Sequence, residues 1–112
     1  MPGGTEISYG NIKMSMILAC TLSPASVVAT TGNEQTFTVA GLQLGDQVSV
    51  SKPSFQNYLS IANTRVSAAN TLAIAFGNSS TANITPTASE VYLVEVNRVN
   101  AIPYTNAPSG IE

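Results

Sequence analysis

The stretch Ile12–Leu22 reads IKMSMILACTL and decides the fold class of the chain. Its even-numbered positions are all apolar, whereas small and polar residues fill most of its odd-numbered positions. An alternation with a period of two places the apolar side chains on one face of a β-strand. The stretch therefore predicts a long strand that is buried on one face, and the predicted inner residues are Ile12, Met14, Met16, Leu18, Cys20 and Leu22.

Short apolar runs separated by turn residues continue outward from this stretch, and the chain has 30 Val, Ile and Thr residues against only seven Leu. Such β-branched composition is typical of strands. We predict an all-β chain folded as an antiparallel β-sandwich, immunoglobulin-like or jelly-roll, with about seven or eight strands. The further predicted strands are a short one at Val27 and Val28, then residues 36–39, 47–51, 61–67, 72–76 and 91–99.

The predicted domain organisation is one β-sandwich over residues 12–99 with an extended arm on each side, residues 1–11 and 100–112. Both arms are rich in Gly, Pro and Asn, yet they contain large apolar residues that need a partner. We expect these residues to contact neighbouring protein chains; they are Ile7, Tyr9, Ile102, Tyr104 and Ile111.

Two predicted strands carry apolar or small residues on both faces. In the strand at residues 72–76, the reverse face has Ala73 and Ala75, followed by Gly77, which would let another layer come close. In the last strand, both faces are apolar, so it is predicted to be covered on both sides. Val91 and Leu93 lie on one face and Tyr92, Val94 and Val96 on the other, and the outer half of this strand is expected to face a partner chain.

Charged residues make up only 9% of the chain, and the formal net charge is -2. Four Lys and Arg residues form no basic patch for a phosphate backbone, so we expect no nucleic-acid partner. The longest mainly apolar stretch, residues 14–22, is about half the length of a membrane helix. We therefore expect no membrane partner, and the first residues do not read as a secretion signal.

The sequence predicts no enzyme activity and no cofactor or metal site. It has no histidine, and its single cysteine, Cys20, shares the apolar face of the first strand and is expected to act as a small buried hydrophobe. No spacing selects a pair of carboxylates: Glu34 and Asp46 fall in predicted turns, and Glu90 and Glu95 fall on opposite faces of one strand. We expect all of the acids to be solvated; they are Glu6, Glu34, Asp46, Glu90, Glu95 and Glu112.

Three other features have a structural and a functional interpretation. Residues 41–46 contain a pair of glycines without the Lys-Ser of a phosphate-binding loop, so a turn is expected there. Asn78 and Asn83 each begin an N-glycosylation pattern, which is informative only on a secretory route. A platform for stacking on sugars could use Phe55, Tyr58 and Tyr92, but packing in the core or in an interface is the favoured interpretation.

The segment 36–96 resembles small β-sandwich proteins of tailed-bacteriophage particles, the head-decoration or cement type. The sequence segments that carry this resemblance are TFTVAGL from Thr36, GDQVSV from Gly45, Lys52-Pro53, RVSA from Arg65, NTLAIAF from Asn70, ITPTA from Ile84 and VYLVEV from Val91. The resemblance implies a virion structural protein, made in the host cytoplasm, that sits on the capsid surface as a trimer and binds the major capsid protein or another virion protein. It supplies no catalytic residue.

The composition also favours a protein whose surface is covered by other proteins. A surface of Ser, Thr, Asn and Ala loses little when another protein covers it, whereas burying an unpaired ion costs several kcal/mol. We expect a capsid decoration protein that stabilises the shell through protein contacts. Two alternatives stay open: a tail, fibre or adhesion module that binds host carbohydrate, and a catalytic or accessory domain of an enzyme that uses carboxylates.

Overall fold

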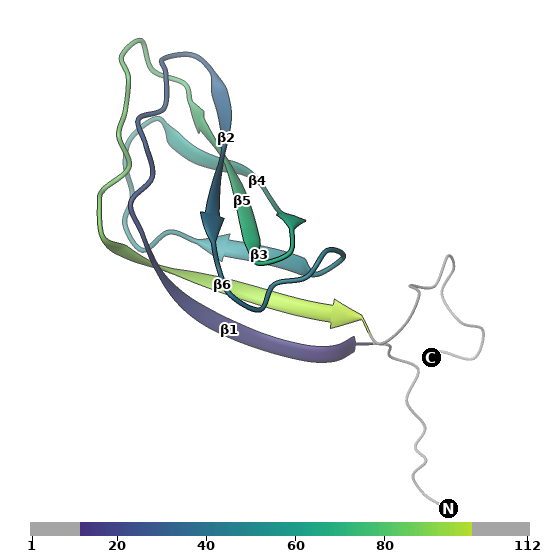
Figure 1. Ribbon diagram of the computed structural model, residues 1–112. Coiled ribbons are helices and arrows are strands. Elements are labelled where there is room, and N and C mark those ends of the chain that lie inside the picture. Colours follow the sequence, from purple (N-terminus) through teal and green to yellow (C-terminus); the bar gives the residue numbers. More distant parts are fainter. Residues whose placement is uncertain (1–11, 100–112) are drawn as a thin grey trace, which may run out of the picture.

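The computed structural model describes residues 12–99, which form two antiparallel sheets of three strands each (Figure 1). One sheet has the order β1-β6-β3, and the other has the order β2-β5-β4. The strands are β1 Ile12–Leu22, β2 Gly32–Thr38, β3 Gln47–Ser51, β4 Leu59–Ala68, β5 Thr71–Asn78 and β6 Glu90–Val99. The prediction of an all-β fold built from antiparallel sheets, as in a small β-sandwich, is confirmed.

The long strand predicted at Ile12–Leu22 is β1, and it pairs along its whole length with β6. Its even-numbered side chains face the other sheet: Leu22 is buried, and Met14, Leu18 and Cys20 pack against the core. Met16 shares this inner face but is 41% exposed. The prediction that Ile12 is an inner residue is wrong, because the register shifts between Ile12 and Met14 and Ile12 pairs with Val99, on the outer face of β6. The alternation thus identified the correct face, although the core covers only part of it.

Residues 12–99 contain six strands, fewer than the seven or eight predicted. The difference lies at Val27, which makes a single bridge with Ile84 instead of a strand. Residues on either side of Val27 belong to the connection that carries the chain from one sheet to the other. A chain that crosses between sheets cannot keep a ladder for several residues, so the short strand predicted here is reduced to one pair.

The first and second halves of the sandwich run side by side as one antiparallel ribbon. β1 pairs with β6, and β2 pairs with β5. Between these two pairs, the connection that follows β1 is bridged to the connection that precedes β6 through Val27 and Ile84. The two connections lie alongside each other as they climb from one sheet to the other (Figure 1). The bridge has two backbone hydrogen bonds, Val27 N–H to Ile84 O at 2.7 Å and Ile84 N–H to Val27 O at 3.0 Å. Since Val27 is fully buried, the ribbon passes from one sheet to the other inside the core. We call the part of the ribbon around Val27 and Ile84 its corner.

The core lies between the sheets and is built mainly from the two central strands, β5 and β6. Burying one such side chain fully contributes about 1.5 to 3 kcal/mol, which is the main term that offsets the ordering of the chain. The largest side chains with almost no exposure are Tyr92, Phe76, Leu72, Ile74, Val27, Val94 and Val96.

The small residues on the reverse face of β5 are covered by side chains of the neighbouring strands. Arg65 of β4 lies opposite Ala73, and Glu34 of β2 lies opposite Ala75. The Arg65 guanidinium donates two hydrogen bonds to the Glu34 carboxylate, at 2.8 and 2.9 Å. This pair crosses the central strand, and Ala73 is fully buried beneath it. Among the described residues no further layer lies on this face, and the side chains of β2 and β4 in the same sheet cover it instead.

The hairpin between β4 and β5 turns at Asn70, whose φ of 59° lies in the left-handed region. Asparagine tolerates this region better than most residues do. The Asn70 side-chain oxygen accepts a hydrogen bond from Gly41 N–H at 2.7 Å, and Asn70 N–H donates to Leu42 O at 2.8 Å. The hairpin therefore holds the connection between β2 and β3, where Gly41 has a φ of 97°.

Asn78, at the end of β5, organises the corner of the ribbon. Its side-chain nitrogen donates to Val27 O and to Ala82 O, both at 2.9 Å. Its side-chain oxygen accepts from the backbone and hydroxyl of Ser80. Because Asn78 is buried and all of these bonds are satisfied, it is a structural residue and its amide is not accessible to a modifying enzyme.

We predict that Asn78→Ala lowers the free energy of unfolding by about 3 kcal/mol, because the buried Val27 carbonyl, the partly buried Ala82 carbonyl and the Ser80 groups lose their partner. Urea denaturation followed by circular dichroism measures the change. The matched control is Asn83→Ala, since the exposed Asn83 accepts only the Ala29 N–H at 3.0 Å; it should cost about 1 kcal/mol or less. Equal losses for the two variants would contradict the structural role of Asn78.

Candidate functional site

The acidic side chains of the described residues are mostly held in ion pairs. The pairs are Glu34 with Arg65, Asp46 with Arg98 and Glu90 with Lys52. The prediction that all the acids are solvated is wrong for Asp46 and Glu90, whose side chains are largely buried. Glu34 also lies within β2 and not in a turn. Glu90 and Glu95 do lie on opposite faces of β6, as expected.

Asp46 has the most enclosed of these carboxylates. It accepts hydrogen bonds from Arg98 Nε at 2.9 Å, from an Arg98 terminal nitrogen at 2.8 Å and from Gln43 N–H at 3.0 Å. The same Arg98 nitrogen also donates to Gly41 O at 2.8 Å. The hydrogen bonds from Arg98, partly opposed by burial, hold the pKa of Asp46 below its ordinary value. Asp46 therefore fastens the turn at residues 41–46 to β6.

Glu90 closes the other end of the same sheet. Lys52 Nζ lies 2.9 Å from one carboxylate oxygen of Glu90, and the Ser54 hydroxyl donates to the other. These two groups, Ser54 first, lower the pKa of Glu90. Two residues along β6, burial and the Glu90 charge raise the pKa of Tyr92 to about 12. The Tyr92 hydroxyl is buried without a hydrogen-bond partner among the described residues, so it is a neutral core group.

The described residues gather no set of side chains for metal binding: no three of His, Cys, Asp and Glu lie together within 12–99. Cys20 packs against the core and is half-buried. Burial raises the pKa of its thiol, which keeps it protonated at neutral pH. The expectation that Cys20 acts as a small hydrophobe agrees with this position.

The outer face of the β1-β6-β3 sheet exposes a cluster of apolar side chains. Ile17 of β1 is 66% exposed, and Leu93 and Val91 of β6 are 49% and 47% exposed. Within residues 12–99, the buried side chains of β6 are even-numbered ones, so no described residue supplies the cover predicted for its second face. We call the surface around these three residues the outer face. It is rigid, since β6 is held by β1 on one side and by β3 on the other.

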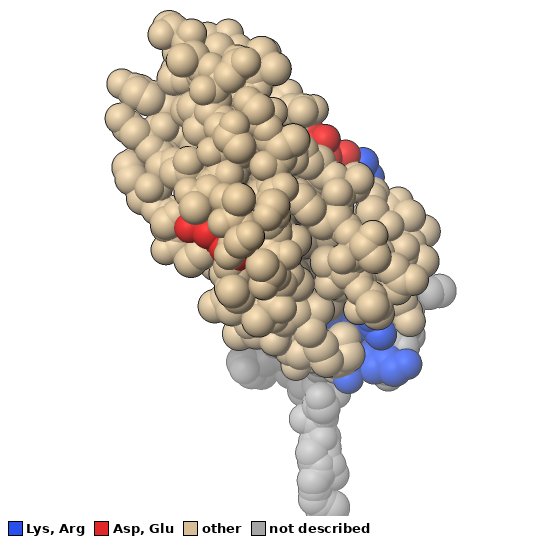
Figure 2. All heavy atoms as spheres, turned by 60° about the vertical axis from the view of Figure 1, so that its left-hand side comes forward, with Lys and Arg blue, Asp and Glu red and all other residues tan. Residues whose placement is uncertain are grey.

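Small neutral residues surround this apolar cluster. The register places Ala19 and Ser51 on either side of Leu93, and Thr21 beside Val91. Glu95, which lies between Ile17 and Ser49, is the charged residue next to the cluster. Figure 2 shows that few charged side chains lie on one side of the molecule. The outer face can therefore be covered without dehydrating many ions.

The candidate platform for stacking on sugars is divided by the structure. Tyr92 is fully buried, so its proposed place in the platform is wrong. Phe55 and Tyr58 are 85% and 57% exposed in the connection between β3 and β4. Gln56 fixes this connection: its side-chain nitrogen donates to Thr85 O at 3.1 Å, and its oxygen accepts from Thr87 N–H at 2.9 Å.

The residues predicted from the sequence to contact neighbouring chains, Ile7, Tyr9, Ile102, Tyr104 and Ile111, lie outside the described residues. For the outer face, the sequence placed Val91 and Leu93 together on one side of the last strand without selecting that side as the exposed one, and it missed Ile17. Ile17 is the large apolar residue on the otherwise small or polar face of β1, and that break in the alternation is the signal that identifies it.

Comparison of the chain with protein-family models, with curated proteins and with solved structures gives no match. Among residues 12–99, no helix is long and apolar enough to pass through a membrane.

We predict that Asp46→Asn lowers the free energy of unfolding at neutral pH by about 2 kcal/mol, because Arg98 loses a charged acceptor. A carboxylate with a lowered folded-state pKa stabilises the fold above its unfolded pKa of about 4, and this contribution is lost as the pH falls through the folded-state value. The difference between wild type and variant should therefore shrink from about pH 4 downward.

Urea denaturation over a range of pH measures this difference. The control is Glu95→Gln, at an exposed acid that makes no ion pair with another described residue, which should change stability by less than about 0.5 kcal/mol. A difference for Asp46→Asn that is independent of pH would show that its charge does not stabilise the fold.

Proposed function

We propose that this chain is a non-catalytic structural protein of a tailed-bacteriophage particle, a decoration or cement protein that binds the capsid surface and stabilises the shell. The observation that carries the proposal is the outer face: a rigid, nearly uncharged sheet surface with Ile17, Val91 and Leu93 exposed together. The sequence resemblance supports the choice of a virion as the assembly. The proposed partner is the major capsid protein or another virion protein, and the resemblance suggests a trimer on the shell.

The physical basis of binding is the low cost of covering this surface. Apolar area removed from water contributes roughly 25 cal/mol per Å². Each buried ion would instead cost several kcal/mol unless it found a partner. A cement protein binds a lattice of repeated sites, so modest contacts multiply when neighbouring copies also touch. The proposed contacts with neighbouring chains involve Ile7, Tyr9, Ile102, Tyr104 and Ile111.

The strand order supports a finer assignment of the fold, a reduced jelly roll. The chain changes sheet at every connection except the β4–β5 hairpin, and the two halves of the chain pair as one wrapped ribbon. An immunoglobulin-like sandwich instead keeps more hairpins within one sheet. Jelly rolls occur in viral capsids and in lectins, so the fold alone does not choose between the shell protein and the carbohydrate-binding module.

The test is the binding of the purified chain to capsids of the phage whose genome encodes it, prepared without this protein. Co-sedimentation should show saturable binding, and electron microscopy of the complex should place the chain on the shell. Leu93→Asp should weaken binding by about tenfold or more, because a charge would be buried in the interface.

The matched control is Thr38→Asp, which adds the same charge to an exposed residue on the other sheet. It should bind like the wild type, and both variants should keep the wild-type circular dichroism spectrum. The absence of binding to the shell, or an equal loss for the two variants, would overturn the proposal.

A second candidate function is binding of a host-surface carbohydrate through Phe55 and Tyr58. Its support is the high exposure of two aromatic side chains on a connection that Gln56 holds in place. Aromatic rings offer flat apolar faces for contact, and a fixed loop reduces the entropy lost on binding.

A glycan array tests this second function directly. If it is correct, the array should give a signal that Phe55→Ala and Tyr58→Ala abolish. Leu44→Ala, at an exposed apolar residue in a different connection, should leave the signal unchanged. An array without signal would remove this candidate, whereas binding to glycans without binding to shells would replace the decoration function with it.

A further inference from the structure

Strand β1 forms an edge of its sheet among the residues that the structure describes. In the order β1-β6-β3 its one described neighbour is β6, so about half of its backbone N–H and C=O groups point away from the sheet. Such edges pair readily with other strands, and proteins usually protect them with charges, proline or a covering segment. Residues 14–22 of β1 contain neither a charged residue nor a proline. This part of the edge is therefore suited to pairing with another strand.

The other three strand edges of the sandwich contact segments of this chain. The Thr64 hydroxyl of β4 donates to Val48 O of β3 at 3.0 Å, which joins the edges of these two strands. The Gln35 side chain of β2 donates to Ala25 O at 2.9 Å and accepts from Ala25 N–H at 2.7 Å. Within residues 12–99, β1 is thus the edge that is most open to a partner.

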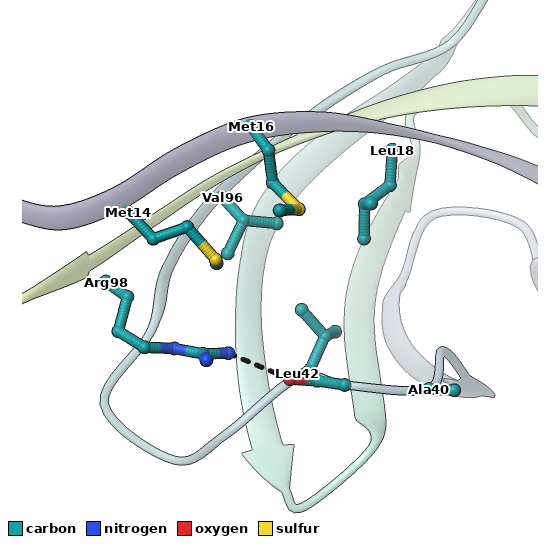
Figure 3. A pocket seen from close by; sticks show the side chains of 8 residues that line it. Met14, Met16, Leu18, Ala40, Leu42, Val96 and Arg98 are labelled. Carbon is teal, nitrogen blue, oxygen red and sulfur yellow. Dashed lines mark hydrogen bonds between the residues drawn. The ribbon is translucent and has the colours of Figure 1, made fainter.

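The side chains beside this edge are apolar and incompletely covered. Met14, Met16 and Leu18 project from β1 toward Leu42 around a hollow of about 250 Å³ (Figure 3). Met16 remains exposed there, and Ile17 is exposed on the outer face. A strand that pairs with β1 would therefore place its own side chains beside apolar neighbours on both faces.

The regular part of β1 determines how two copies could pair. The register with β6 shifts between Ile12 and Met14 and is regular from Met14 to Leu22. In an antiparallel pair related by a two-fold axis, opposite residues lie on the same face, and full pairing of the regular part places its midpoint, Leu18, opposite its own copy. Met16 then lies opposite Cys20 of the second copy. All of the opposite pairs on the inner face are apolar in this register.

We propose that β1 pairs with β1 of a second copy of this chain, antiparallel and about a two-fold axis, through residues 14–22. The pairing joins two three-stranded sheets into one continuous sheet. It places Ile17 opposite Ala19 of the second copy and diagonal to the second copy's Ile17. The proposal does not depend on the proposed function, and the pair is a different assembly from the trimer that the resemblance suggests.

Charge and area both fit a reversible dimer of this kind. Lys13 precedes the paired segment, so its two copies lie at opposite ends of the pair, roughly 30 Å apart. Charges at that distance are screened, since the Debye length is about 10 Å at 0.1 M salt. The paired edge is about 30 Å long and buries roughly 1,000 Å² in total, which is typical of weak specific interfaces. We therefore expect a dissociation constant in the micromolar range.

Sedimentation equilibrium of the full chain tests the proposal. The mass should rise with concentration from that of one chain to that of two. Ile17→Lys places two like charges on diagonal neighbours and should raise the dissociation constant about tenfold or more. The matched control is Leu93→Lys, which adds the same charge to the same outer face one strand away from the edge; its dissociation constant should stay within about twofold of the wild-type value.

Both lysine variants replace exposed side chains and should keep the wild-type circular dichroism spectrum. An equal loss of dimer in the two variants would show that the outer faces associate instead of the edges. That result, a single-chain mass at every concentration, or a mass of three chains would each overturn the proposal.

Cysteine crosslinking tests the register. Met16→Cys places a thiol opposite Cys20 of the second copy, at a Cα separation of about 4.5 to 5.5 Å, which a disulfide can span. Within one chain these two positions are roughly 13 Å apart along the strand and cannot be bridged. Mild oxidation should therefore give a covalent dimer on a non-reducing gel.

The matched control for the crosslink is Met14→Cys, which lies opposite Leu22 of the second copy and should stay a single chain on the same gel. The wild type, whose single cysteine lies opposite Met16, should also stay a single chain. A covalent dimer in Met14→Cys, or its absence in Met16→Cys, would overturn the proposed pairing.

Discussion

The fold depends on the bridge between Val27 and Ile84, where the ribbon formed by the two halves of the chain changes sheets. β1 pairs with β6 on one side of the bridge, and β2 pairs with β5 on the other. Without the bridge, each sheet would have to align its long-range partners independently. The polar groups around the bridge are hydrogen-bonded: Val27 O accepts a hydrogen bond from Ile84 N–H and another from the Asn78 side-chain nitrogen. The corner is thus a polar junction inside an apolar core, which is stable only when every bond is made.

The scarcity of charge at the surface follows from how the few charges are used. The described residues include eight charged side chains, and six of them form the three ion pairs. Asp46 with Arg98 fastens the β2–β3 connection, Glu90 with Lys52 fastens the end of β3, and Glu34 with Arg65 covers the small residues of β5. Each pair joins segments far apart in the chain, so the charges act within the fold, and most of the remaining surface is neutral.

The local pattern of residues predicted the strands, but it could not predict which residues far apart in the sequence pair with one another. The alternation in Ile12–Leu22 and the end of the predicted strand 47–51 at residue 51 each depend on neighbouring residues, and both appear in the structure. The burial of Asp46 depends on Arg98, 52 positions away, and nothing in the turn sequence signals that partner. Val27 fits a strand by composition, but its role is decided by the crossing between sheets. For the candidate site, Val91 and Leu93 could be predicted from the two-sided pattern of β6, whereas their position beside Ile17 required the register.

Neutrality and edge protection are linked in a protein of this composition. Most proteins keep open strand edges apart partly through charge, because like charges on two copies repel. With a net charge of -2 and Lys13 as the single charge on β1, this chain has little repulsion available. A neutral outer face is useful for docking only if the adjacent edge does not also recruit copies at random.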